Sequence, residues 1–264
     1  MKKERVDKLL VDRGLAETLQ KAQALIMAGL VFSGDRRLEK AGQLVPRDAD
    51  VALQRPLPFV SRGGLKLKEA LDAFHLDVSG RTCADIGSST GGFTDCLLQR
   101  GAAKVYAVDV DIRQIDRRLR DDPRVVLIEK NARHLVRDDL AGFPDIIVMD
   151  VSFISVLKII PGLRDVISPG GRLLSLLKPQ FEAGRGQVGK KGIVRDPAVH
   201  AEILQKIAGE ATGLGFVLHG FLRCSTLGKT GNQEFFGLWS AGGFPPPWET
   251  VLQWIKEVTR DEND

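Results

Sequence analysis

The stretch DIGSSTGGFTD, residues 85–95, decides the fold of this 264-residue chain. The β-prone residues 82–84 precede it, and the apolar residues 96–98 that follow predict a helix that ends at Gly101. A strand, a glycine-rich turn and a helix in this order form the nucleotide-binding start of a doubly wound α/β sheet. The spacing of the glycines matches neither the G-x-G-x-x-G turn of dinucleotide-binding proteins nor the phosphate-binding P-loop.

The turn suits a nucleoside that carries an amino acid. Gly87, Gly91 and Gly92 let a ligand approach the backbone, and the N-terminus of the helix can receive a carboxylate. S-adenosylmethionine has such a carboxylate and no phosphate tail, so it fits the turn better than a nucleotide does. The alternative is an ordinary strand-to-helix turn that binds nothing.

The composition, with 43% hydrophobic and 27% charged residues, is typical of a globular protein. Residues 1–12 alternate charged and apolar residues, unlike a secretion signal, and no run approaches the roughly 18 apolar residues of a membrane span. We therefore expect a cytoplasmic protein without stable membrane association. Cys83, Cys96 and Cys224 form no C-x-x-C pair, which favours free thiols over disulfides or a metal site.

The positive charge is concentrated at the front of the chain. Residues 1–72 contain 14 Lys and Arg against 10 Asp and Glu, which accounts for the whole net charge of +4. A basic front end on a neutral body indicates an anionic partner, of which nucleic acid is the usual kind. The alternative is a solvated surface.

The first 54 residues predict a small separate module. Residues 6–10 and 22–26 have the apolar spacing of two short helices, each followed by a glycine, and residues 30–32 and 51–53 predict strands. A segment of this size buries little apolar surface, so we expect it to work with a partner.

This module resembles the S4 RNA-binding domain. The resemblance rests on RVDKLL at residues 5–10, ALIMAGLV at residues 24–31, the turn at Gly34 and DADV at residues 48–51. It implies that cations of the module meet RNA phosphates. A small helical cap without a role in RNA binding is the alternative. The candidate RNA-binding residues of the module are Arg5, Lys21, Arg36 and Arg37.

Beyond the glycine-rich turn, predicted strands alternate with helical stretches. This alternation favours a mostly parallel, Rossmann-like sheet covered by helices on both faces. Two further strands near the C-terminus predict an antiparallel closure, which is typical of S-adenosylmethionine-dependent methyltransferases. The predicted strands are residues 104–109, 124–128, 145–150, 171–177, 216–224 and 234–239, and the helical stretches lie around residues 116–119 and 156–167.

Two polar residues at predicted strand ends fit an adenosine cofactor. Asp109 ends the second strand, 24 residues after Asp85. A carboxylate at this spacing holds the two ribose hydroxyls of such a cofactor. Asn131 follows the third strand, where the adenine would lie.

Charged residues at other strand ends favour transfer to a hydroxyl group. Asp150 ends the fourth strand, Lys178 ends the fifth and Glu234 begins the last, while Lys66 lies near the start of a predicted helix. The residues after Asp150 are Val-Ser-Phe-Ile, unlike the N-P-P-Y type of sequence that surrounds an amine acceptor. A lysine with a pKa of about 10.4 is protonated at neutral pH, and burial or a second cation lowers that value. Plain surface charges are the alternative.

The chain as a whole resembles the TlyA family, also called hemolysin A, which joins an S4 domain to an FtsJ-like ribose methyltransferase domain. The motifs that carry the resemblance extend along nearly the whole chain. They are VSRGGLKL (60–67), DIGSSTGGFTD (85–95), MDVSFIS (149–155), LLKPQFE (176–182), KGIVRD (191–196) and GNQEFF (231–236).

The resemblance implies 2′-O-methylation of ribosomal RNA, free or in ribosomal subunits, with S-adenosylmethionine as donor and no metal. Its catalytic set falls on Lys66, Asp150, Lys178 and Glu234, with Lys66 as the leading candidate to deprotonate the hydroxyl. The cofactor-binding residues would be Asp85, Gly87, Ser88, Gly91, Phe93, Asp109 and Asn131.

The long loop 179–197 is rich in glycines and cations and predicts either a basic lid over the acceptor strand or a plain surface connection. With Arg62 it supplies further candidate RNA contacts, namely Arg185, Lys190 and Lys191. We divide the chain into an S4-like domain (1–54), a linker (55–60), a methyltransferase domain (61–245) and a C-terminal helix and tail (246–264).

Three other functions compete with RNA methylation. A non-catalytic RNA-binding or assembly factor would keep the cofactor pocket and transfer nothing. A membrane-active hemolysin finds no support in the short, core-like amphipathic stretches. A small-molecule O-methyltransferase is disfavoured by the front module.

Overall fold

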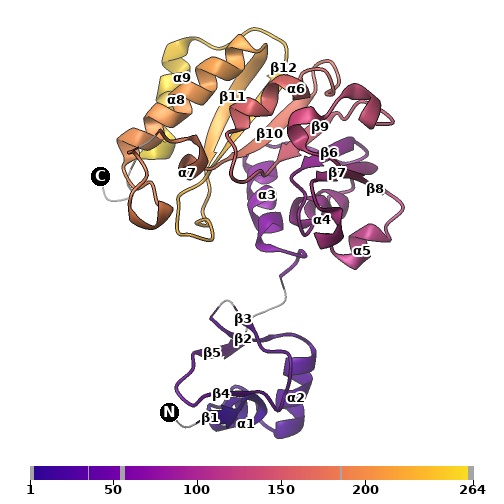
Figure 1. The fold of residues 1–264 in the computed structure, drawn as a ribbon, viewed down its shortest axis with the longest axis vertical. Helices are drawn as coiled ribbons and strands as arrows, with labels where there is room; N and C mark the ends of the chain where they lie inside the picture. The colour runs from indigo at the N-terminus through magenta and orange to yellow at the C-terminus, as the bar shows by residue number, and fades with distance from the viewer. Residues whose placement is uncertain (1–2, 35, 54–56, 185, 261–264) are drawn as a thin grey trace. The chain divides into compact units, whose positions relative to one another are not determined.

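The computed structural model describes residues 3–34, 36–53, 57–184 and 186–260, and the chain divides into two compact units, Met1–Pro58 and Phe59–Asp264 (Figure 1). Residues 55 and 56 of the predicted linker lie outside the described residues. Each unit has a hydrophobic core of its own.

The first unit packs two helices on short strands. The predicted helices and two of the strands are confirmed, and Gly14 and Gly29 follow the helices with φ of +69° and +71°. Two antiparallel sheets form, β1 with β4 and β2 between β3 and β5. Strands β1, β3 and β4 were not predicted, because β1 and β3 consist of charged residues and β4 contains a proline. The elements are β1 (Lys3–Arg5), α1 (Val6–Asp12), α2 (Leu19–Met27), β2 (Val31–Ser33), β3 (Arg36–Arg37), β4 (Leu44–Pro46) and β5 (Val51–Leu53).

A buried carboxylate connects the two helices of this unit. Asp7 on α1 is fully buried and accepts hydrogen bonds from Arg5 Nε and Nη2 at 3.0 and 2.6 Å and from Gln23 Nε2 of α2 at 3.2 Å. The Arg5 guanidinium lowers the pKa of Asp7 from 3.8 to about 2. A buried charge needs this degree of compensation.

The second unit is built on a sheet of seven strands in the order β11-β12-β10-β9-β6-β7-β8 (Figure 1). All neighbouring pairs are parallel except the two that involve β12. The prediction of a mostly parallel sheet with an antiparallel closing strand is confirmed. The antiparallel strand is β12, and it lies between β10 and β11. The strands are β6 (Thr82–Ile86), β7 (Lys104–Asp109), β8 (Val125–Glu129), β9 (Ile146–Met149), β10 (Arg172–Leu177), β11 (Phe216–Arg223) and β12 (Phe235–Ala241).

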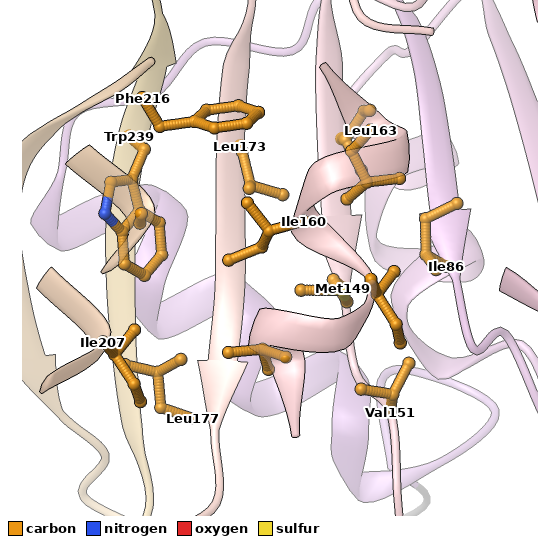
Figure 2. Packing of buried hydrophobic residues seen from close by; sticks show 14 of the residues in the cluster. Ile86, Met149, Val151, Ile160, Leu163, Leu173, Leu177, Ile207, Phe216 and Trp239 are labelled. Atoms are coloured by element: carbon orange, nitrogen blue, oxygen red, sulfur yellow. The ribbon is translucent and has the colours of Figure 1, made fainter. Parts of the chain in front are cut away.

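Helices cover both faces of this sheet. On one face α6, α8 and α9 pack over Trp239, Leu173 and Met149, and Figure 2 shows Ile160 and Ile207 within this layer. On the other face α3, α4 and α5 bury the second cluster. The helices are α3 (Arg62–Ala73), α4 (Gly92–Gln99), α5 (Arg117–Arg120), α6 (Ile160–Leu163), α7 (Pro179–Glu182), α8 (Pro197–Gly213) and α9 (Trp248–Thr259).

Two helical regions differ from the sequence-based expectation. Residues 156–167 form two short pieces, η4 (Val156–Lys158) and α6, because Pro161 lacks the amide hydrogen that a continuous helix needs. The 17-residue helix α8 was not predicted, although Asp196 caps its start by accepting a hydrogen bond from Ala198 N. Within the described ranges, no helix has the length and apolar character to cross a membrane.

Replacing Asp7 by Asn is expected to loosen the first unit. Because the folded pKa of Asp7 lies below its ordinary value, its contribution to stability is complete above about pH 4 and is lost as the pH falls through about 2. At neutral pH, loss of the charge-assisted bonds should cost about 1–3 kcal/mol. Hydrogen exchange of the α1 amides in the intact protein would measure this loss.

Asp12→Asn, on the exposed face of the same helix, is the matched control. Equal exchange rates in the Asp7→Asn and Asp12→Asn proteins would show that the buried carboxylate does not stabilise the unit.

Candidate active site

A cavity of about 600 Å³ lies at the carboxyl ends of β6, β9 and β10. This volume is within the range of small-molecule binding sites. Six segments of the described chain meet in its wall: the glycine-rich turn after β6, the start of α3, the segment after β9, the segment after β10, the loop between β11 and β12, and part of the predicted lid.

The N-terminal turns of α3 and α4 approach closely because each contains a glycine at the contact, Gly64 and Gly92. A Cβ atom at Gly92 would lie 2.1 Å from Ser61 Oγ and 3.1 Å from the Gly64 amide nitrogen. Asp95 on α4 also accepts a hydrogen bond of 2.8 Å from Val60 N. This contact fixes helix α3, and therefore Lys66, against the turn that would hold the cofactor.

The four predicted catalytic residues all line this cavity and form two ion pairs. Lys66 Nζ lies 2.5 Å from Glu234 Oε2, and the two side chains are 11% and 5% exposed. Lys178 Nζ lies 2.5 Å from Asp150 Oδ1 and donates a hydrogen bond of 2.9 Å to Ser152 Oγ. Two amines and two carboxylates thus meet at one site, each charge compensated by a partner.

Gly228 gives Glu234 the room to form its ion pair. A Cβ atom at this position would lie 2.4 Å from Glu234 Oε1. The Gly228 amide also donates to the Asn232 carbonyl at 2.8 Å, which closes the loop between β11 and β12. Any side chain at residue 228 would displace the carboxylate that holds Lys66.

Some of the predicted cofactor-binding residues line the cavity, and others support the residues that line it. Gly87, Ser88 and Phe93 line the cavity. Gly91 caps α4 in the left-handed conformation, with φ of +91°. Gly87 has a φ of +86°, and a Cβ there would lie 2.4 Å from the Asp150 carbonyl oxygen, so the turn and the end of β9 touch backbone to backbone.

Asp85 supports the turn from below the surface and does not line the cavity. It is fully buried, and its Oδ2 accepts hydrogen bonds from Thr94 N and Oγ1 at 2.9 and 2.6 Å. Burial raises the pKa of this carboxyl to about 7. Its Oδ1 is buried and receives no hydrogen bond from the described residues.

Asp109 and Asn131 lie at the same edge of the sheet, beyond the cavity wall. Asp109 ends β7 and accepts hydrogen bonds from Ser89 N at 2.8 Å and Asp111 N at 3.0 Å. Asn131 accepts a bond of 3.1 Å from Arg133 N. The open glycine turn, the helix N-terminus and the acid after β7 fit S-adenosylmethionine.

The predicted RNA contacts occur in both units. Arg62 and Lys191 line the cavity, Lys190 begins the short helix η5 (Lys190–Gly192), and Arg185 lies outside the described residues. In the first unit Lys21 is exposed and forms an ion pair with Glu17. Arg5 is engaged by Asp7, and Arg36 and Arg37 are exposed on β3.

Sequence reasoning gave no role to several residues of the wall. Phe153 has a φ of +64°, is 90% exposed, and lies 5.1 Å from Phe181 between ring centroids. Ser152, Lys229 and Thr230 also line the cavity. The motifs MDVSFIS and LLKPQFE contain these two phenylalanines. The sequence alone does not show whether a phenylalanine ring is exposed or buried.

A partly buried glutamate holds the segment that carries Phe153. Glu182 of α7 accepts hydrogen bonds from Ser155 Oγ at 2.6 Å and Val156 N at 2.8 Å. Burial raises the pKa of this carboxyl. The exposed ring therefore stands on an anchored turn. Among the described residues, no cluster of His, Cys, Asp and Glu could hold a metal ion.

Comparison with known proteins matches two parts of the chain to family models. Residues 59–239 match the family model "FtsJ-like methyltransferase", and residues 4–51 match "S4 domain". "Putative rRNA methyltransferase YqxC" of Bacillus subtilis is 50% identical over 89% of this chain and 84% of its own. "16S/23S rRNA (cytidine-2'-O)-methyltransferase TlyA" of Mycobacterium tuberculosis is 44% identical over 89% of this chain and 88% of its own.

A solved structure named "Putative hemolysin" from Streptococcus thermophilus has the same fold. It superposes with a TM-score of 0.75 at 39% identity, covering 98% of this chain and 96% of that chain. The expected resemblance to the TlyA, or hemolysin A, family is confirmed by these relatives.

The three cysteine thiols are expected to be unreactive in the folded protein. All three are buried, and burial raises the pKa of Cys83 and of Cys96 to about 12 and raises that of Cys224 as well. Only the thiolate is nucleophilic, so a disulfide reagent at pH 8 should label no thiol without denaturant and all three with it. Rapid labelling of one thiol in the native protein would show that this cysteine is reactive and would contradict the expectation.

Proposed function

This chain belongs to the FtsJ-like methyltransferase family and carries an S4 domain, and we propose that it transfers a methyl group from S-adenosylmethionine to a ribose 2′-hydroxyl of ribosomal RNA. The observation that carries the proposal is the pair of ion pairs, Lys66 with Glu234 and Lys178 with Asp150, in the wall of one cavity beside the glycine-rich turn.

The acceptor must be a group that loses a proton. A ribose hydroxyl is a poor nucleophile and needs a base and accurate placement. S-adenosylmethionine, when bound, supplies the methyl group as an electrophile. Lys66 Nζ first releases its own proton to solvent, and as a neutral amine it then takes the hydroxyl proton as the oxygen gains its methyl group, which returns Lys66 to the charged form. Glu234 holds the amine in place, while Lys178 and Asp150 orient the hydroxyl.

The charge of the cavity wall favours a polyanionic substrate. Five cations line it against two carboxylates: Arg62, Lys66, Lys178, Lys191 and Lys229 against Asp150 and Glu234. Phosphates of an RNA strand satisfy such an excess. The exposed Phe153 ring offers a face on which an unstacked base can stack.

The relatives support the choice of RNA. Their names specify ribosomal RNA and, for the mycobacterial protein, the cytidine 2′-oxygen in 16S and 23S molecules. We extend this substrate to the present chain, together with S4 contacts to structured RNA through Lys21, Arg36 and Arg37. An enzyme with this substrate works in the cytoplasm, on free ribosomal RNA or on ribosomal subunits.

Replacing either lysine of the site by Arg or Ala is expected to abolish transfer. Arg keeps a cation for the neighbouring carboxylate but cannot give up its proton at neutral pH, so Lys66→Arg separates proton transfer from ion pairing. We expect a loss of at least about 100-fold, the usual contribution of a general base. Transfer of labelled methyl to ribosomal subunits measures it, and calorimetry should find the cofactor affinity nearly unchanged.

Lys68→Arg is the matched control, because Lys68 lies on the same helix, half exposed and paired with Asp72. Full activity in the Lys66→Arg and Lys178→Arg proteins would rule out both amines as the base. Binding of RNA by the wild-type chain without any transfer would identify a non-catalytic RNA-binding factor instead.

Gly228→Ala is expected to lower transfer by about 100-fold without weakening cofactor binding. The added methyl group displaces Glu234 from Lys66, and a shift of about 1 Å at a catalytic group has a cost of this size. Gly213→Ala is the control, because nothing lies within 4 Å of a Cβ atom at that residue. Equal transfer rates in the two variants would contradict a role for the Lys66–Glu234 pair.

A further inference from the structure

Part of the loop between α7 and α8 forms one side of the cavity. We call residues 186–194 the lid, and three of them, Val188, Lys191 and Gly192, line the cavity. Lys191 and Gly192 both have positive φ, +67° and +74°, so the chain makes a tight turn there. Hydrogen bonds from Gly189 N to the Ile193 carbonyl and from Gly192 N to the Gly189 carbonyl close the turn.

One buried amide side chain connects this lid to the loop between β11 and β12. Asn232 is fully buried. Its Oδ1 accepts a hydrogen bond of 2.9 Å from Val194 N, and its Nδ2 donates bonds of 2.9 Å to the Gly192 carbonyl and to Thr230 Oγ1. Both amide hydrogens and the amide oxygen are therefore engaged.

The hydrogen-bond partners of Asn232 belong to two different loops of the cavity wall. Two of them belong to the lid, and the third, Thr230, lines the cavity from the opposite loop. That loop also carries Gly228, Lys229 and Glu234. The lid has a second attachment through His200 of α8, whose Nε2 lies 3.1 Å from the Val194 carbonyl oxygen. Asn232 is thus the attachment that joins the two cavity-lining loops to each other.

We propose that Asn232 is a positioning residue that holds the lid and the β11–β12 loop together, so that Lys191 and Lys229 present a preformed surface to the RNA strand. The inference rests on the proposed function and adds a residue to its site. Asn232 is not among the described residues that line the cavity. Its effect passes through the two lysines, because a cation on a loosened loop loses conformational entropy when it binds a phosphate.

Asn232→Asp tests the proposal with the least change of shape. The carboxylate can still accept from Val194 N, but it cannot donate to Gly192 or Thr230, and it brings an oxygen against the Gly192 carbonyl. We expect the KM for ribosomal subunits to rise about tenfold, while the affinity for S-adenosylmethionine stays within twofold. We also expect faster hydrogen exchange at the Val194 amide.

Gln187→Ala is the matched control on the same lid. Gln187 bonds Gly184 N and Glu202 of α8 at 2.8 Å each, so its loss affects the end of the lid that Asn232 does not hold. We expect its KM for ribosomal subunits to stay within twofold of the wild type. Asn232→Ala serves as a second variant, whose thermal unfolding separates a loosened lid from a damaged fold.

The outcomes separate this proposal from the function on which it rests. A wild-type chain that transfers no methyl group overturns the proposed function, while exchange at the Val194 amide still tests the lid attachment. Unchanged exchange and unchanged KM in both Asn232 variants overturn the positioning role and leave the proposed function standing. A fall in cofactor affinity equal to the rise in KM would show a general structural role and would also overturn it.

Discussion

The absence of a side chain at three glycines is the constraint on which the site depends. Gly92 lets the first turns of α3 and α4 touch, Gly87 lets the glycine-rich turn meet the end of β9, and Gly228 leaves space for the carboxylate of Glu234. Each contact brings one charged residue of the site to the same cavity: Lys66, Asp150 and Glu234. Close packing transmits small displacements, so each glycine controls a position several residues away.

The charges of the site are stable because they come in pairs. The two lysine side chains are 11% and 12% exposed, and an unpaired charge at such depth would cost several kcal/mol. In each pair the two partners lie far apart in the sequence, so the site exists only in the folded chain. The three cysteines are buried, and burial raises the pKa of each thiol.

The sequence predicted the sheet and the strand ends well because both depend on local patterns. Apolar runs ended by Asp109, Asp150 and Lys178 identify strands and the edge where ligands bind. The position of β12 between β10 and β11 could not be predicted, since strand order depends on long-range pairing. The role proposed for Asn232 could not be predicted either. The identity of one residue shows neither that its side chain is buried nor which two loops its hydrogen bonds join.

The two compact units are connected by a very short piece of chain. Strand β5 ends at Leu53, and the second unit begins at Phe59. Under the proposed function, a first unit bound to RNA raises the local concentration of the second unit at nearby nucleotides, because both units belong to one chain. Covalent joining of the two units would therefore favour riboses near the RNA segment that the first unit binds, independently of any base that the site reads.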